Sequence, residues 1–436
     1  MPIKDYDKLA EQKLIKACRM GAALQISTER PTEGTALNTI RAGLIRELLL
    51  GTEDCNPPAR GLYIQGAWII EQLDLEGEEL QVPLLLHNCT LAEDVNLFDC
   101  TLPGLYQTDT HLPALRAHRL RCRGSLHLRH GFEASGLVAL VGAKIAGQLA
   151  CTGGKFLAEG MALNCDAITI GADVFLSDGF EARGEVMLGR AEIAGNLDMS
   201  GAKLGKGLIA SGMRVRAAFA WWNVQGHGIT VGLIDAHVGT LVDEAKSWDP
   251  VRRLYLSSFR YERIESDMDV QERLDWLAKH DATVSRFIPA PYVQLANVLR
   301  RQGFAREAAQ VLIRREDKQR AAEWDAAVTG MDGTFQRELI ASAHQYRPLL
   351  SLPFKWMFGY GHQPARVLPW IAIIWAVTFC FAEQTHRRGQ FAPTSTVVLN
   401  SPKWLRSFPS TPLPGRLAAL AGAIGCLGQD RTRARL

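Results

Sequence analysis

The stretch "RAEIAGNLDMSGAKLGKGL", residues 190–208, contains the rhythm that decides the fold. Its residues Ala191 and Ile193 are followed eleven residues later by Ala202 and Leu204, which are of the same small and aliphatic types. A repeat at a fixed short period is typical of a solenoid, in which each unit packs only against its neighbours. The question is therefore how far this period extends along the chain.

The eleven-residue period covers twelve units. Two residues after the start of each unit the residue is apolar: Ile69, Leu80, Leu91, Leu102, Ala134, Ile145, Phe156, Ala167, Ala182, Ile193, Leu204 and Val215. A second apolar pair follows six and eight residues after the starts, as in Leu197 and Met199. Because side chains two residues apart in a strand lie on one face, we expect both sets to point into a core.

Between the apolar pairs stand Gly, Asn and Asp, as at Gly195, Asn196 and Gly205, and these residues accept tight bends and positive φ. Short strands joined by sharp corners at a fixed period form a solenoid, whose backbone hydrogen bonds run to the turns above and below. The sequence therefore predicts a mainly β fold, a right-handed parallel β-solenoid with two 11-residue units, or 22 residues, in each turn. The alternative, a globular β-sandwich, does not explain the unbroken register.

The register slips in two places. Residues 103–131 do not fit it, and four extra residues separate Cys165 from Phe180. We expect protruding loops at both places, because a solenoid carries its inserted segments and its specific contacts on loops.

Helical spacing outside the repeats predicts how the solenoid begins. Residues 4–19 and 37–50 carry apolar residues at helical intervals, the second through Leu37 with a stop at Gly51. These segments predict an N-terminal helical cap, residues 1–58, on a β-solenoid that spans 59–245.

Helical spacing returns after the repeats and predicts an α-helical domain over residues 250–346. Within it, residues 290–320 have the spacing of one tetratricopeptide-like helical hairpin. Such a hairpin is either a structural element or part of a peptide-binding groove, and both interpretations stay open here.

A transmembrane helix is predicted at residues 365–384. Its centre, "VLPWIAIIWAVTFCFA", contains sixteen uncharged residues, whereas a spanning helix needs about 20. A buried core helix is the alternative. Basic residues are balanced on the two sides, so charge predicts no orientation. An irregular basic tail is expected over 385–436.

Composition and cysteines narrow the class of protein. A chain of 436 residues with 47% hydrophobic and 22% charged residues is folded and too long for one ordinary core. The net charge of +3 gives no support to a nucleic-acid partner. The nine cysteines include no CxxC pair, and the first residues contain no apolar signal core. We therefore expect the N-terminal part of the chain in a reducing cytoplasm.

Six blocks in order along the chain carry a resemblance: "IRAGLIRELLLG", "GLYIQGAWIIEQLDLEG", "FRYERIES", "RLDWLAKH", "PYVQLANVLRRQGFAREAAQVLIRRE" and "FGYGHQPARVLPW". Over residues 37–400 the chain resembles a bacterial family of pentapeptide-like β-solenoid proteins with membrane-spanning C-termini. The label usual in that family implies a membrane-associated oxidoreductase, but the resemblance carries no catalytic residue. Residues 406–436 depart from it: they are rich in Pro and Arg, as expected of a truncated or frame-altered gene end.

Motifs for chemistry are weak. No GxGxxG opens a helix after a strand, and Gly205, Gly207 and Gly212 fall inside the repeat register. The close pair His127 and His130 points to opposite faces at strand spacing, so we predict no metal site. The acidic run of residues 71–79, which a β-helical lyase or hydrolase would use, has the spacing of a solvated face. We predict no cofactor and assign no catalytic residue.

The most unusual charge pattern is "RAHRLRCRGSLHLRH", residues 116–130, which contains five Arg, three His and no acid. Alternation places Arg119, Arg121 and Arg123 on one face, where they are candidates for binding an anion such as a phosphate or a lipid head group. The alternative is a solvated wall balanced by acids of neighbouring turns. Taken together, the patterns predict a membrane-tethered scaffold with a protein partner on the solenoid wall, and a membrane-associated oxidoreductase is the alternative.

Overall fold

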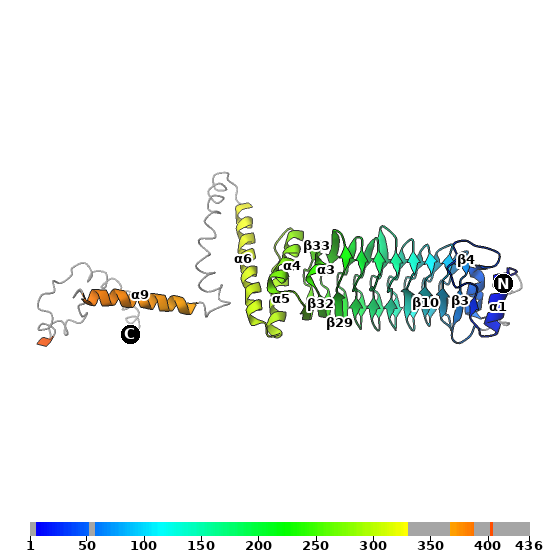
Figure 1. The fold of residues 1–436 in the computed structure, drawn as a ribbon, viewed down its shortest axis with the longest axis horizontal. Coiled ribbons are helices and arrows are strands. Elements are labelled where there is room, and N and C mark those ends of the chain that lie inside the picture. Colours follow the sequence, from blue (N-terminus) through cyan, green and yellow to red (C-terminus); the bar gives the residue numbers. More distant parts are fainter. Residues whose placement is uncertain (1–5, 52–56, 330–366, 388–401, 404–436) are drawn as a thin grey trace, which may run out of the picture. The chain divides into compact units, whose positions relative to one another are not determined.

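The structure is a computed structural model that describes residues 6–51, 57–329, 367–387 and 402–403 (Figure 1). The chain divides into two compact units, Met1–His344 and Gln345–Leu436. The first unit is a long parallel β-solenoid with helices at both ends (Figure 1). The mainly β solenoid predicted from the repeats is therefore confirmed.

Each turn of the solenoid has four sides, which we call walls 1 to 4. Wall 1 consists of β3 (Leu62–Gln65), β6 (Leu84–His87), β10 (Leu105–Thr108), β14 (Leu126–Arg129), β18 (Leu149–Ala150), β22 (Val174–Phe175) and β26 (Leu197–Asp198), with β1 (Leu24–Gln25) ahead of them. Wall 2 consists of β2 (Thr39–Arg41), β4 (Trp68–Ile70), β7 (Thr90–Leu91), β11 (His111–Leu112), β15 (Glu133–Ala134), β19 (Lys155–Phe156), β23 (Glu181–Ala182), β27 (Lys203–Leu204) and β30 (Gln225–Gly226).

Wall 3 consists of β5 (Leu73–Asp74), β8 (Val95–Asn96), β12 (Leu115–Arg116), β16 (Val138–Ala139), β20 (Met161–Asn164), β24 (Glu185–Met187), β28 (Gly207–Ile209), β31 (Ile229–Gly232) and β33 (Val251–Tyr255). Wall 4 consists of β9 (Thr101–Leu102), β13 (Arg121–Cys122), β17 (Lys144–Ile145), β21 (Thr169–Ile170) and β25 (Glu192–Ile193). Three longer strands, β29 (Arg214–Trp221), β32 (His237–Asp243) and β34 (Arg260–Ser266), continue both wall 4 and wall 1, so that these two walls form one sheet.

Parallel pairing stacks equivalent residues of successive turns. Leu62 pairs with Leu84, which lies 22 residues further along the chain, so two 11-residue units make one turn as predicted. The core is a set of stacked columns of buried apolar side chains. In the opening stretch, Leu197 and Met199 are fully buried.

Eleven of the twelve predicted wall positions are buried, and Ala167 is not. Ala167 lies at a corner with φ 54°, because the extra residues enter the chain before it and not after Cys165. The paired residues Val138 and Leu163 are 25 positions apart, and the pairing of β20 is irregular between Met161 and Leu163. The loop predicted between residues 165 and 180 is therefore wrong in its position. The exposed insertion lies at residues 157–161 instead.

Residues 103–131 form no protruding loop, which corrects the second expectation. They form β10 to β14, and Leu105 pairs with both Leu84 and Leu126 in turns of 21 residues. Two polar residues hide the repeat in the sequence, because Gln107 and Thr110 occupy fully buried inward positions.

The corners use a left-handed residue after the second residue of an apolar pair. Gly201, with φ 71°, sits in a turn that Ala202 N closes on Met199 O at 3.1 Å. Gly195 and Gly205, which the sequence suggested as bends of positive φ, do not have it. A Cβ on Gly205 would lie 2.2 Å from Arg183 O, so this glycine is needed because two turns approach closely.

The N-terminal end is covered by α1 (Leu9–Arg19) and α2 (Ala42–Leu50). Helix α2 begins later than the predicted 37–50, because Thr39–Arg41 pairs with β4 as the first rung of wall 2. Leu37 lies outside the helix and is 61% exposed.

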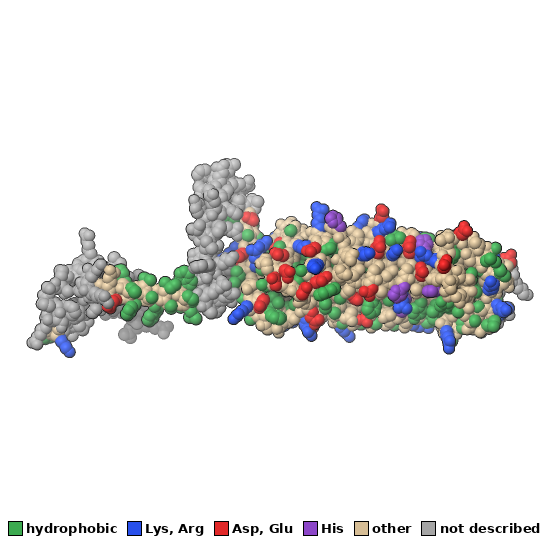
Figure 2. Space-filling view, in the orientation of Figure 1, with side chains coloured by type: hydrophobic (Ala, Val, Ile, Leu, Met, Phe, Trp, Pro, Cys, Tyr) green, Lys and Arg blue, Asp and Glu red, His purple; other side chains and the backbone are tan. Residues whose placement is uncertain are grey.

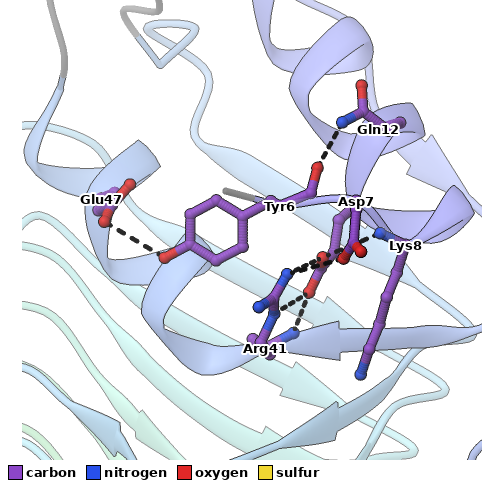
Figure 3. A network of polar contacts seen from close by, with 7 residues as sticks. Tyr6, Asp7, Lys8, Gln12, Arg41 and Glu47 are labelled. Carbon is purple, nitrogen blue, oxygen red and sulfur yellow. Dashed lines mark hydrogen bonds and ion pairs between the residues drawn. The ribbon is translucent and has the colours of Figure 1, made fainter. Parts of the chain in front are cut away.

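A polar network fixes α1 onto this first rung (Figure 3). The fully buried Glu11 carboxylate accepts hydrogen bonds from the Arg41 backbone N at 3.0 Å and from its Nε at 2.8 Å. The Arg41 guanidinium lies 4.7 Å from the centre of the Tyr6 ring, and Tyr6 Oη donates to Glu47 Oε1 at 3.2 Å. The network joins segments that are distant in sequence at the end of the solenoid.

The C-terminal end is covered by α4 (Val270–Thr283), α5 (Ala290–Arg301) and α6 (Ala305–Thr329). Strands β33 and β34 lie beyond residue 250, so the solenoid continues into the region for which helices were predicted. Residues 290–320 fall on α5 and α6, which pack against each other. Residues 330–346 of the predicted helical domain lie outside the described residues.

A buried ion pair joins α4 to the last turns of the solenoid. Arg273 forms an ion pair with Asp243, and both are buried. Asp243 Oδ2 also accepts a hydrogen bond at 2.8 Å from Nε1 of Trp248, which lies at the end of α3 (Ala245–Trp248). Trp248 contacts the rings of Trp221 and Trp276, so three tryptophans close the core.

In the second unit, the described part is essentially one helix, α9 (Val367–Arg387). Among the described residues it is the one helix long and apolar enough to cross a membrane, by length and composition. No residue of its window Leu368–Thr385 is buried by the described residues. Most of the predicted tail, 385–436, lies outside the described residues.

Candidate interaction surface

The three candidate anion-binding arginines are all exposed, but their surroundings differ. Arg119 lies at a corner with φ 54°, where its Nε donates to Asp99 Oδ1 at 2.7 Å. Its guanidinium also lies 4.3 Å from the centre of the Phe98 ring. Hydrogen bonding by Arg119 lowers the pKa of Asp99, so this arginine already holds an anion of its own chain.

Arg123 forms an ion pair with Glu79, which comes from an earlier turn. Arg121 lies on β13, where its neighbour on the next rung is Lys144 of β17. No ion pair of Arg121 is present among the described residues. Two of the three arginines are thus paired to acids of earlier turns, and anion binding by the three stays a prediction.

A different surface stands out on wall 1. We call its outward positions on β3 to β22 the aromatic wall: Tyr63, Gln65, Leu85, His87, Tyr106, Thr108, His127, Arg129, Ala150 and Phe175. No carboxylate occurs among these positions, and the first outward acid on wall 1 is Asp198 of β26. Figure 2 shows apolar and histidine side chains together over the region of β3 and β10.

The aromatic wall is tightly packed at its centre. The rings of Tyr106 and His127 meet edge to face, with their centres 4.9 Å apart. His127 is only 8% exposed, and its Nε2 lies 3.0 Å from Gln148 Nε2. Burial lowers the pKa of His127, so the ring is neutral at pH 7. The wall therefore presents fixed, largely uncharged rings.

The opposite composition is found on wall 2. Glu133, Lys155, Glu181 and Lys203 follow one another on neighbouring rungs. Opposite charges on adjacent strands stabilise each other and remain solvated. Wall 2 is thus an ordinary water-facing surface, whereas the outward positions of the aromatic wall include no acid and a single arginine, Arg129.

The structure also places the residues weighed for chemistry. His127 is on strand β14, and His130 is at an exposed corner with φ 48°. No group of three His, Cys, Asp or Glu side chains that could hold a metal ion occurs among the described residues. Gly207, one of the three glycines compared with a phosphate-binding loop, has φ 128°, and a Cβ there would lie 1.9 Å from Thr230 O. The close contact between two turns therefore explains why residue 207 is a glycine.

The acidic run is engaged by neighbouring side chains. Asn96 Nδ2 donates to Asp74 Oδ1 at 2.9 Å and to Glu76 Oε2 at 3.0 Å. Glu78 forms an ion pair with Arg46, and Glu79 forms one with Arg123. These contacts are those of a hydrogen-bonded surface between turns.

Comparison with known proteins adds no function. No family model, no curated protein and no solved structure matches the chain. The aromatic wall itself was missed in the sequence. A signal was present, because Tyr63, Leu85 and Tyr106 recur at intervals of 22 and 21 residues and occupy equivalent outward positions.

Proposed function

We propose that this protein is a membrane-anchored scaffold whose β-solenoid binds a protein partner through the aromatic wall. The observation that carries the proposal is the composition of wall 1 over β3 to β22, which is aromatic and free of acids, whereas wall 2 alternates acids and lysines. The core of a protein interface is depleted of charged residues and enriched in Tyr, Trp, Phe, Met and Arg. Tyr63, Tyr106, Phe175 and Arg129 are residues of those types.

The anchor is α9. Eight of its large apolar side chains are exposed: Leu368, Ile371, Ile373, Ile374, Trp375, Val377, Phe379 and Phe381. Apolar surface left in water is unfavourable by about 25 cal/mol per Å², so a helix of this kind calls for a bilayer or a protein to cover it. Its length suits a bilayer.

The size of the wall indicates what kind of complex it supports. Four strands of about 13 Å and two of about 7 Å, spaced about 4.8 Å apart, give roughly 300 Å². A stable interface needs about 800 Å² on each partner. The wall alone therefore favours a weak, reversible complex, for which attachment to a membrane raises the effective concentration of the partners.

The location follows from the cysteines and from the resemblance. Burial raises the pKa of Cys89 to about 11 and that of Cys100 to about 12, so both are inert thiols in the core. Free core thiols are ordinary in a reducing compartment. We place the solenoid on the cytoplasmic side of the inner membrane, because the motifs resemble a bacterial pentapeptide-like solenoid family with membrane-spanning C-termini. Nothing in the described residues favours the oxidoreductase alternative, which visible absorbance and metal analysis of purified protein would reveal.

The anchor is tested by carbonate extraction of membranes that contain the full chain. The variant Ile373→Glu with Val377→Lys introduces an oppositely charged i, i+4 pair, which supports the helix. Each of the two charges costs about 3 kcal/mol at the centre of a bilayer. We expect the parent chain in the carbonate pellet and this variant in the supernatant, with Ile373→Leu plus Val377→Leu as the matched control. A parent chain that carbonate releases would contradict the anchor.

The wall is tested by photo-crosslinking in the cells that make the protein. A photoreactive residue in place of Leu85 or Tyr106 should give the same discrete crosslinked species, and one in place of Lys155 or Lys203 on wall 2 should not. The additional substitution Phe175→Glu should weaken the crosslink from position 106, because it introduces a charge on the wall. Equal crosslinking from both walls would rule out the proposed surface.

A further inference from the structure

The turn between α5 and α6 carries an exposed aromatic residue among basic residues. We call Arg300, Arg301, Phe304 and Arg306 the hairpin tip. Phe304 is 51% exposed, and the only other exposed aromatic side chain in described residues 6–326 is Trp222. Phe304 therefore stands out on a unit whose other described Phe, Tyr and Trp rings, except that of Trp222, are buried or half-buried.

The backbone of the turn fixes Phe304 in this position. Gly303 has φ 93°, which bends the chain, and Phe304 N donates to Leu299 O at 2.9 Å. Gln302 anchors the turn to the solenoid, because its Nε2 donates to Ile264 O at 2.9 Å. The tip is thus held on the last turn of the solenoid and is not a loose loop.

The charge around Phe304 has one sign. Arg300, Arg301 and Arg306 are exposed, and none of them forms an ion pair among the residues that the structure describes. The nearest acid in the sequence is the half-buried Glu307. Glu265 follows Ile264, to which Gln302 is hydrogen-bonded, and it forms an ion pair with Arg263 at 3.1 Å. The tip thus presents three exposed cations within four residues of one exposed aromatic residue in the sequence.

We infer that the hairpin tip is a second membrane contact, which touches the surface of an anionic bilayer while α9 spans it. Aromatic rings partition into the interface between lipid and water, and basic residues beside them are attracted to anionic head groups. This inference rests on the proposed membrane anchor. Because α9 already holds the chain at the bilayer, the tip has a high effective concentration near the head groups, so a weak attraction is sufficient.

The test uses the full chain in bilayer nanodiscs of phosphatidylcholine alone or of phosphatidylcholine mixed with phosphatidylglycerol. Chymotrypsin cleavage after Phe304 reports how accessible the tip is. We expect cleavage to be slower by about fivefold in the anionic discs, with protection lost at high salt, since exposed charges are screened. Hydrogen exchange of the peptide covering residues 299–308 provides the same comparison if the folded chain resists the protease.

Two variants distinguish the effect of the charges at the tip from the effect of the net charge of the protein. Arg300→Ser, Arg301→Ser and Arg306→Ser together retain Phe304, so cleavage can still be followed, and they should abolish the difference between the discs. The matched control removes three exposed arginines of the solenoid, Arg214, Arg216 and Arg253, and should retain it.

Equal cleavage in neutral and anionic discs would overturn the inference, and so would protection by a soluble oligonucleotide without protection by anionic lipid. The latter result would identify the tip as a nucleic-acid contact. Carbonate extraction is measured in parallel on membranes that contain the same chains. A chain that stays in the pellet with an unprotected tip would refute the second contact alone, whereas a chain that carbonate releases would refute the anchor.

Discussion

Glu11 and Arg41 lie thirty residues apart in the chain and form a two-point ion pair across the first turn of the solenoid. The carboxylate is fully buried, and the guanidinium is partly exposed beside the Tyr6 ring. The pair joins α1 to β2, so it ties the helical cap to the first rung of wall 2. Its contribution to stability should therefore depend on pH.

Glu11→Gln should destabilise the protein at pH 7 and should remove a pH dependence. Burial raises the pKa of Glu11, but hydrogen bonds from Arg41 outweigh this effect and lower the pKa below its ordinary 4.5. A carboxyl whose pKa is lower in the folded state stabilises that state above the unfolded pKa, and this stability is lost as the pH falls through the folded value. We expect a loss of about 1–3 kcal/mol, because the pair is partly exposed.

Urea denaturation of the parent and of Glu11→Gln between pH 7 and about pH 3 measures this difference. The control is Asp7→Asn, since Asp7 belongs to the same network but is 90% exposed. The difference between the parent and Glu11→Gln should shrink as the pH falls below the ordinary pKa of 4.5. A difference that is constant over the whole range would show that the pair does not act through its charge.

Leu197→Asp should destabilise the solenoid far more than Asp198→Ala. Leu197 is fully buried in the column that continues to Phe219, whereas Asp198 points outward and accepts one hydrogen bond, at 2.9 Å, from Ser200 N. Burying an unpaired carboxylate costs several kcal/mol, while an outward Asp is lost for about 0.5 kcal/mol. Thermal melts of the two variants compare them directly, and equal melting temperatures would contradict the inward and outward assignment.

Gly207→Ala should be strongly destabilising, by about 3 kcal/mol or more, because a Cβ would meet the carbonyl of the next turn at a φ that favours glycine. Gly160→Ala is the matched control. A Cβ at Gly160 meets nothing within 4 Å, and this glycine lies in the exposed insertion. Its effect should stay within about 0.5 kcal/mol. Similar losses for both variants in chemical denaturation would mean that the contact between the turns is not tight.

The predicted anion site is best tested at Arg121, because Arg119 and Arg123 already hold Asp99 and Glu79. If the strip binds anions, Arg121→Ser should weaken retention on a heparin column in detergent at low salt, and the triple variant with Arg119→Ser and Arg123→Ser should weaken it further. The effect should fade at high salt because exposed charges are screened over about 10 Å at 0.1 M. Retention equal to that of the parent and of the control Arg253→Ser would leave the strip as a solvated wall.

The sequence alone determined the period of the solenoid and the inward residues, because each short strand repeats the same neighbours at intervals of about 22 residues. The prediction from the sequence was wrong where the period changed. Turns of 21 residues with Gln107 and Thr110 buried looked like a loop, and the insertion at 157–161 shifted the register of Ala167. A period read along one chain cannot reveal that a polar side chain occupies a core column, since only the stacked neighbours define that column.

Tertiary structure decided which side chains face each other across turns. The pairing of Arg119 with Asp99 and of Arg123 with Glu79 arises because residues about one and two turns apart come together on the same surface. The aromatic wall arises in the same way, from outward residues that are 21 and 22 positions apart in sequence. The ion pairs Glu11–Arg41 and Asp243–Arg273, whose carboxylates are buried, also need the folded ends, because only a closed core makes an unpaired charge costly there. Local periodicity thus determines the wall, and stacking of the turns determines what each wall presents.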